Sequence, residues 1–351
     1  MTNPATSAAQ PRSGSIVTGP GSGPQGVPLA IALTPILSAR YRKRDLDAIA
    51  SAAPGSRLVS VSLEGLADAD LTDIEVLLRG PLPAGVFDRL LARCPNLRWV
   101  HSATAGVERV LTPAAIERGL AITNARGVFS EPIAEYVLMM ILAISRRLPQ
   151  LLELQRERTW QPLEANELAD VTVGVIGYGS IGRRVAQLAA AFGSHVVGVR
   201  RGSAPDEPPI AGVELVTSDR LEDVLGRIDF IVLALPLTKG TEEMFSNELL
   251  ARVKRGAWLI NVARGRLVDE RALVRALRDG PLGGAVLDTF VDEPLPADSV
   301  LYELPNVILT PHTSWSSGRA LDRSVDLFCD NLRRFARGER LVNLVDPKVG
   351  Y

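Results

Sequence analysis

The chain has 351 residues, of which 46% are hydrophobic and 23% charged, and its formal net charge is -1. This length exceeds one ordinary hydrophobic core and the composition is globular, so we expect two domains and exclude disorder throughout. The near-neutral charge, without a long run of Lys and Arg, gives no reason to expect a nucleic acid or membrane partner, and a small molecule is the expected one.

The two cysteines, Cys94 and Cys329, have no CxxC spacing and are too few for a disulfide framework. This usage suits a reducing compartment, so we expect a cytoplasmic protein with two buried thiols. Residues 1–27 are rich in Ser, Gly, Pro and Ala and lack the apolar segment of a secretory signal, which predicts a disordered tail. The most apolar segment, YVLMMILAI, stops at Ser145 and is too short to span a membrane.

From Pro28 the chain alternates short β-rich segments with helical patterns, which is typical of parallel sheets covered by helices. The segments LAIALT, NLRWVHSATAGVE and AITNARG predict strands of a first domain. Ser130 is the predicted N-cap of the helical segment that follows. That segment is too apolar for a solvated surface, so we expect it to lie between domains or against a second subunit.

Six further β-rich segments, VTVGVIG, HVVGV, IDFIVLALP, AWLINVA, GGAVLDT and NVILT, predict a doubly wound sheet of six strands. A final helix with one apolar stripe and Gly338 as its stop is expected to return to the first domain. The segment from Leu341 starts like a strand that could extend the first sheet. These patterns predict an α/β protein with a substrate domain over 28–127 and 316–351 and a dinucleotide-binding domain over 128–315.

A phosphate-binding loop is predicted where Gly177, Gly179 and Gly182 form G-x-G-x-x-G between a β segment and a helical one. The first Gly permits a tight turn, the second lets the backbone approach a pyrophosphate, and the third brings the helix against the strand. The alternative is a glycine-rich turn without a ligand.

Arg200 and Arg201 follow the next β segment, where a protein specific for NAD usually has an acid for the ribose 2'-hydroxyl. Two permanently charged guanidinium groups suit a 2'-phosphate instead, so NADP is the preferred cofactor and NAD the other candidate. The alternative is that both arginines are solvated surface residues.

The chain from Pro28 resembles the D-isomer-specific 2-hydroxyacid dehydrogenase family. The resemblance rests on VGVIGYGSIGRRVA, LALPLT, LINVARGRLVDERAL, AVLDTFVDEPLP and LTPHTSW in this order. It implies a flavodoxin-like substrate domain, a Rossmann domain, interdomain helices, a homodimer, and reduction of a small 2-oxo acid to the D-2-hydroxy acid or the reverse. The implied catalytic residues are Arg264, Glu293 and His312.

The residue types of this set suit that chemistry independently. Reduction of a carbonyl requires a proton for the developing alkoxide, and His312 is the side chain that supplies a proton near neutral pH. Glu293 would favour the imidazolium and fix its tautomer. Arg264 would orient the substrate with its guanidinium fork and stabilise growing negative charge.

The resemblance also predicts binding residues, and no metal site is expected. Asp288 would hydrogen-bond the nicotinamide carboxamide. The backbone amides of Ala105, Gly106 and Val107 would bind the substrate carboxylate. The remaining predicted cofactor contacts are Tyr178, Ser180, Ile181, Pro236, Thr238, Val262 and Ala263.

Two questions stay open from the sequence. Trp315 stands where many family members have a small residue, so it either makes the pocket wall bulkier or packs against the neighbouring domain. The alternative function is a dinucleotide-sensing, corepressor-like or scaffold protein that acts through protein contacts and needs no proton relay.

Overall fold

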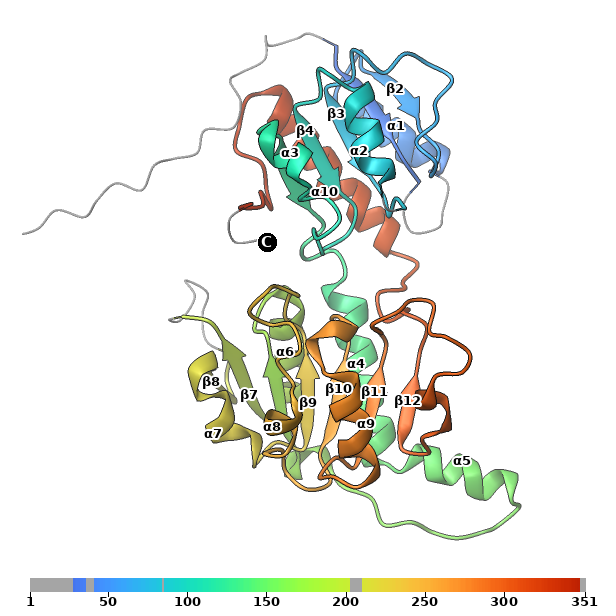
Figure 1. Ribbon diagram of the computed structural model, residues 1–351, viewed down its shortest axis with the longest axis vertical. Helices are drawn as coiled ribbons and strands as arrows, with labels where there is room; N and C mark the ends of the chain where they lie inside the picture. The colour runs from blue at the N-terminus through green and yellow to red at the C-terminus, as the bar shows by residue number, and fades with distance from the viewer. Residues whose placement is uncertain (1–27, 36–40, 84, 203–209, 348–351) are drawn as a thin grey trace, which may run out of the picture.

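The computed structural model describes residues 28–35, 41–83, 85–202 and 210–347, so the predicted tail over 1–27 lies outside the described residues. The chain forms two parallel sheets, one of five strands and one of seven, in two separate lobes (Figure 1). Helices cover both faces of each sheet. The predicted fold class, with two doubly wound parallel-sheet domains, is confirmed.

The first sheet has the strand order β2-β1-β3-β4-β5. This order is that of flavodoxin-like folds. Helices α1 and α10 pack on one face, and α2 and α3 on the other. The elements are β1 (Ala30–Leu33), α1 (Lys43–Ala52), β2 (Arg57–Ser60), β3 (Val76–Arg79), α2 (Val86–Arg93), β4 (Trp99–Ser102), α3 (Pro113–Glu117), β5 (Ala121–Asn124) and α10 (Ala320–Ala336).

The second sheet has the order β12-β11-β10-β9-β6-β7-β8, with all neighbouring strands parallel. Its order reverses between β6 and β9, where doubly wound sheets bind ligands. The strands are β6 (Thr172–Ile176), β7 (His195–Arg200), β8 (Val213–Thr217), β9 (Phe230–Leu233), β10 (Trp258–Asn261), β11 (Gly284–Leu287) and β12 (Val307–Leu309). Runs such as Phe230–Leu233 are apolar throughout because both faces of the strand are buried.

Helices α4 and α6 cover one face of the second sheet, and α7, α8 and α9 cover the other (Figure 1). They are α4 (Ser130–Ser145), α6 (Ser180–Ala191), α7 (Leu221–Leu225), α8 (Asn247–Leu250) and α9 (Glu270–Arg278). Short 3-10 turns lie at Leu168–Asp170, Ser218–Arg220, Gly265–Leu267 and Val300–Glu303. The apolar segment predicted between domains therefore packs on this sheet and against α6, and only its start lies at the junction between the two lobes.

The N-cap prediction for α4 is wrong. Ser130 is the first helical residue and Phe129 occupies the cap position, without a side-chain hydrogen bond to the helix. The cap is dispensable because Phe129 packs edge-on against Trp315, with ring centroids 6.3 Å apart, which fixes the entry of the chain into the helix. Burial of apolar side chains, rather than a polar cap, defines this helix end.

Helix α5 (Leu148–Arg156) projects away from the second sheet and buries none of its residues (Figure 1). Leu148, Leu151 and Leu152 are exposed on it, and Trp160 beyond it is 100% exposed. Within the described part of the chain, no helix combines the length and apolar character needed to cross a membrane.

The sequence prediction missed β2 and β3 in the first sheet and β8 in the second. The second sheet therefore has seven strands, whereas six were predicted. Strands β2 and β8 are edge strands with charged, partly exposed residues, and they lack the continuous apolar run that marks the inner strands. The C-terminal segment contributes only one antiparallel bridge, between Thr123 and Leu344, in place of the predicted strand. The final helix returns to the first sheet as predicted, with Gly338 in the left-handed region beyond its end.

Candidate active site

The glycine loop has the geometry of a dinucleotide-binding turn. Gly177 follows β6 with a φ of 102°, and a Cβ there would lie 2.6 Å from the backbone of Ala234. A Cβ on Gly182 would lie 2.0 Å from the carbonyl oxygen of Gly177, so the helix approaches the strand too closely for any side chain. Around Gly179, by contrast, nothing lies within 4 Å, which leaves open space over the loop.

Helix α6 presents its N-terminus to that open space. Gly179 is its N-cap and makes no side-chain cap, and Ser180 and Ile181 form its first turn. The first amides of a helix have no partner within the helix, and together with the helix dipole they bind phosphate. The ring of Tyr178 covers Gly198 on β7, where a Cβ would lie 2.5 Å from the ring. These residues fit a dinucleotide pyrophosphate.

Arg200 is the last residue of β7 and Arg201 follows it, at the same edge of the sheet as the glycine loop. Arg200 is partly buried, and its Nε has no hydrogen-bond partner among the described residues. Arg201 is exposed. The structure therefore places both arginines at the edge of the sheet that carries the glycine loop.

Four further predicted cofactor contacts lie in the loops at the carboxyl ends of β9 and β10. Pro236 and Thr238 follow β9, and the hydroxyl of Thr241 bonds the Pro236 carbonyl at 2.7 Å and the Thr238 amide at 2.8 Å. Val262 and Ala263 follow β10. This places them across the switch point from the glycine loop.

Arg264 is held at the end of the same loop. The side-chain amide of Asn261 donates to the Arg264 carbonyl at 2.8 Å, and the guanidinium donates to the Ala263 carbonyl at 2.7 Å. Its Nε lies 3.3 Å from Oε1 of Glu108, which comes from the first lobe. The ion pair joins the two lobes at the predicted catalytic arginine.

Two glycines allow Arg264 to sit between these loops. A Cβ on Gly106 would lie 1.9 Å from Nη2 of Arg264, so a larger residue in the substrate loop would displace the guanidinium. A Cβ on Gly265 would lie 2.0 Å from the backbone carbon of Phe290. The glycine after Arg264 therefore lets the β10 loop pack on the loop that carries Glu293.

His312 and Glu293 form a direct pair. Nδ1 of His312 lies 2.8 Å from Oε2 of Glu293, although the two residues follow different strands, β12 and β11. Both side chains are about two-fifths exposed. The Nδ1 contact leaves Nε2 as the ring nitrogen available to a substrate. The imidazole therefore lies within hydrogen-bond distance of Glu293, as the predicted catalytic set requires.

The surroundings of Glu293 keep its carboxylate ionised. Burial would raise its pKa, but hydrogen bonds from His312 and from the Phe290 amide, together with the positive charge of Arg264, lower the pKa below its ordinary value. A charged carboxylate beside an imidazole stabilises the imidazolium and orients the ring. The three predicted catalytic residues are therefore near one another and electrostatically linked.

Asp288 lies deeper than the prediction of a nicotinamide contact implies. It is fully buried, with Oδ1 accepting from the Thr310 hydroxyl at 2.5 Å and the Thr313 amide at 2.8 Å. Its Oδ2 accepts from the Ser314 amide at 2.9 Å. In this structure Asp288 holds the turn that carries His312.

The predicted substrate loop follows β4. The carbonyl oxygens of Ala105 and Gly106 accept from the side chains of Asn124 and Thr104, at 2.8 and 2.9 Å. None of the hydrogen bonds recorded over the described ranges uses the amides of residues 105–107 as donors. The carbonyls of this loop are thus engaged, whereas its amides remain available as donors. This arrangement suits a carboxylate ligand.

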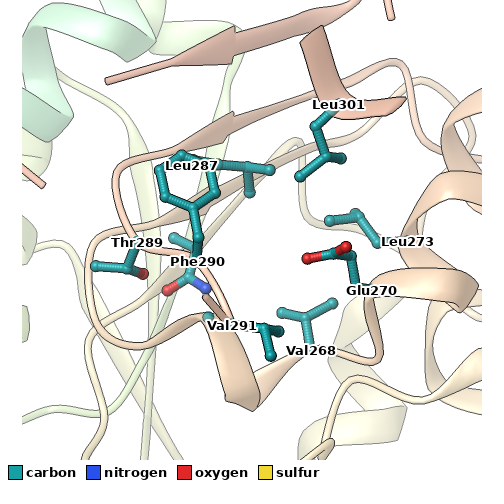
Figure 2. Close-up of a pocket in the computed structure, with 10 residues that line it drawn as sticks. Val268, Glu270, Leu273, Leu287, Thr289, Phe290, Val291 and Leu301 are labelled. Atoms are coloured by element: carbon teal, nitrogen blue, oxygen red, sulfur yellow. The ribbon is translucent and has the colours of Figure 1, made fainter. Parts of the chain in front are cut away.

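A small cavity lies behind these loops and is distinct from the site. Figure 2 shows it between the β11 loop and the start of α9, with Glu270 and Thr289 among mostly apolar side chains. Its volume of about 10 Å³ is that of roughly one water molecule. It is too small for a substrate.

Sequence reasoning missed Glu108 and Tyr136 in this region, and it left the role of Trp315 open. Glu108 pairs with Arg264, Tyr136 contacts the Thr310 hydroxyl at 2.7 Å, and the Trp315 indole donates to the His312 carbonyl at 2.7 Å. The Trp315 ring packs edge-on against Phe129, which lies in the same predicted domain, so its effect on the pocket wall stays a prediction. An acid directly after the small-residue loop was the one signal for Glu108.

Comparison with known proteins agrees with this geometry. Residues 138–314 match the family model described as D-isomer specific 2-hydroxyacid dehydrogenase, NAD binding domain. A glyoxylate reductase of Korarchaeum cryptofilum is 35% identical over 314 residues, which cover 87% of this chain and 90% of that protein. The chain belongs to the D-isomer-specific 2-hydroxyacid dehydrogenase family.

Two further relatives are named for different substrates. A D-3-phosphoglycerate dehydrogenase of Mycobacterium bovis is 38% identical over 263 residues, which cover 74% of this chain but only 49% of that longer protein. The crystal structure of an NADPH-dependent glyoxylate/hydroxypyruvate reductase from Sinorhizobium meliloti, in complex with NADP and sulfate, superposes with a TM-score of 0.79. The two sequences are 30% identical, and the superposition covers 93% of this chain and 100% of the Sinorhizobium chain. The present chain is thus an NAD(P)-dependent oxidoreductase of 2-oxo and 2-hydroxy acids.

Proposed function

We propose that this dehydrogenase reduces a small 2-oxo acid to the D-2-hydroxy acid with NADPH, with His312 as the general acid. The observation that carries the proposal is the 2.8 Å contact between His312 and Glu293, formed beside Arg264. The sequence separates these residues, and only the parallel-strand topology brings an acid, an imidazole and a guanidinium to one place.

The residues of the chain divide the work. The free amides of residues 105–107 bind the substrate carboxylate, and Arg264 orients the carbonyl and stabilises the charge that grows on its oxygen. His312 then donates a proton from Nε2 to that oxygen, while Glu293 stabilises the imidazolium beforehand and holds the ring. The nicotinamide, when bound over the glycine loop, supplies the hydride. In the reverse direction His312 accepts the proton.

The cofactor preference follows from charge at the end of β7. Arg200 and Arg201 suit the 2'-phosphate of NADP, and the acid that would repel it is missing there. The Sinorhizobium relative named above is NADPH-dependent, which supports the same preference. Glyoxylate and hydroxypyruvate, for which that relative is named, are the substrates we favour, because both are small 2-oxo acids.

Turnover is the decisive test. Purified protein with NADPH and glyoxylate, hydroxypyruvate, pyruvate or a longer 2-oxo acid should consume the near-ultraviolet absorbance of the reduced cofactor. His312→Ala should lower kcat by about 10²-fold or more and leave NADPH affinity nearly intact. Collapse of cofactor binding in this variant would contradict the assigned role. No observation favours the alternative of a sensor that acts through protein contacts.

We also propose the domain boundaries and the dimer. A substrate domain over 28–127 and 316–351 is supported by the packing of α10 on the first sheet, and a dinucleotide-binding domain over 128–315 by the packing of α4 on the second. The exposed apolar side chains of α5, together with Trp160, offer a surface for a second copy of the chain. A cytoplasmic location remains our expectation from the two free cysteines.

A further inference from the structure

The backbone at His312 is unusual. Its φ is 49°, in the left-handed region that residues with a Cβ seldom adopt. Such a conformation persists only where the surrounding structure holds it, and it is often found where a side chain must be aimed at a reaction. The groups that hold this turn are therefore candidates for residues that act through His312.

Three hydrogen bonds hold the turn directly. The carboxylate of Asp288 accepts the amides of Thr313 and Ser314 at 2.8 and 2.9 Å, and the indole of Trp315 donates to the His312 carbonyl at 2.7 Å. Asp288 is fully buried, and each of its two carboxylate oxygens accepts from a backbone amide, which is the arrangement of an ionised carboxylate.

A third bond to Asp288 fixes the direction of a longer chain. The Thr310 hydroxyl lies 2.5 Å from Oδ1 of Asp288 and 2.7 Å from the hydroxyl of Tyr136. An ionised carboxylate only accepts, so the single proton of Thr310 points to Asp288, and Thr310 must accept from Tyr136. Burial is the main reason that the pKa of Tyr136 is raised to about 12, and the phenol stays a donor.

We propose that Tyr136 and Thr310 are positioning residues for His312, acting through the buried carboxylate of Asp288. Tyr136 comes from α4, which packs against α6, the helix that begins at the phosphate-binding turn. The chain of hydrogen bonds connects the turn at His312 to α4. The inference rests on the proposed role of His312 as the general acid.

The test compares variants that remove single hydroxyls. Tyr136→Phe should lower kcat with NADPH and glyoxylate or hydroxypyruvate by about 3- to 10-fold, the effect of one buried hydrogen bond. Thr310→Val, which keeps the side-chain shape, should lower kcat by about 10-fold or more, because it also leaves Asp288 short of a donor. Thr310→Ser retains the hydroxyl and should restore kcat to within about 2-fold of wild type. Tyr302→Phe, at a tyrosine that is 57% exposed, is the control.

A purely structural role would give a different pattern. We expect Kd for NADPH to stay within about 2-fold of wild type in Tyr136→Phe, because this variant leaves both the phosphate loop and the bond from Thr310 to Asp288 in place. Unchanged kcat in Tyr136→Phe and Thr310→Val would overturn the proposal. So would a fall in kcat that comes with an equal loss of NADPH affinity and that Thr310→Ser does not rescue.

Nuclear magnetic resonance separates this inference from the proposed function. The chain has three histidines, so the ring signals of His312 are assigned by comparison with His312→Gln. Tyr136→Phe should shift or broaden them while Tyr302→Phe leaves them in place. If the wild type turned over no 2-oxo acid, the proposed function would fail, and these signals would still decide whether Tyr136 positions the imidazole. Unchanged His312 signals in Tyr136→Phe would overturn the inference.

Discussion

Gly106→Ala tests whether the substrate loop and Arg264 form one site. A Cβ at this position would lie 1.9 Å from Nη2 of Arg264 and 2.5 Å from Oε2 of Glu108. Since non-bonded heavy atoms pack about 3.5 Å apart, the guanidinium must retreat by roughly 1.5 Å. The obstacle is the far end of a flexible side chain, so the fold can accept the extra methyl group and the melting temperature should change little.

The catalytic effect should be large by comparison. Misplacement of an orienting group by about 1 Å costs about 10²-fold in rate, so kcat/KM for glyoxylate or hydroxypyruvate should fall by about that factor. NADPH affinity should hold, because the glycine loop belongs to the other sheet. Oxidation of NADPH followed by absorbance, NADPH titration and thermal unfolding measure the three quantities.

Gly226→Ala is the matched control, since a Cβ there meets its nearest neighbour, the Arg252 carbonyl oxygen, at 3.9 Å. Gly226 has a φ of -66° at the end of α7, so alanine should leave kcat/KM unchanged. Wild-type kcat/KM in Gly106→Ala would refute the reasoning. So would a loss of the same size when Arg264 is already replaced by Ala, because the effect would then not pass through the guanidinium.

Three other outcomes are expected. Burial lowers the pKa of His101 to about 3, so the unfolded chain gains a proton that the folded chain excludes, and stability should fall by about 2 kcal/mol from pH 6.5 to pH 5. Urea unfolding of His101→Gln should lack this part of the slope, and an identical slope would contradict the assignment. Arg200→Ser should lower kcat/KM with NADPH by about 10- to 100-fold and alter that with NADH by about 2-fold at most, as loss of a charge-assisted bond predicts; equal losses with both cofactors would exclude contact with the 2'-phosphate. Light scattering should show a dimer that Trp160→Ser weakens, and a monomeric wild type would end that proposal.

The sequence predicted those parts of the site whose residues directly follow an apolar strand. Arg264, Glu293 and His312 each lie in a loop after β10, β11 or β12, so strand and loop together locate the side chain at one edge of the sheet. The glycine loop is also predictable because it directly follows an apolar strand. Its glycine spacing is set by local contacts, such as the close approach of Gly182 to Gly177.

Contacts between distant segments left no such local signal. Glu108 lies 156 residues from Arg264, and Tyr136 lies 174 residues from Thr310. Tyr136 has no feature that distinguishes it from a core aromatic, and the one signal for Glu108 is its place directly after the small-residue loop. Strand β8 was missed for a different reason, because an edge strand with exposed charge lacks the periodicity of a buried one.

Asp288 shows how a residue can be identified correctly as part of a site and still be assigned too narrow a role. A carboxylate offers about four acceptor positions, and three are occupied by Thr310, Thr313 and Ser314. One position therefore remains for a carboxamide donor, although the side chain is fully buried. The 313–314 turn that Asp288 holds also fixes the backbone of His312. If Asp288 also contacts the nicotinamide as predicted, cofactor binding and the placement of the catalytic imidazole depend on the same carboxylate.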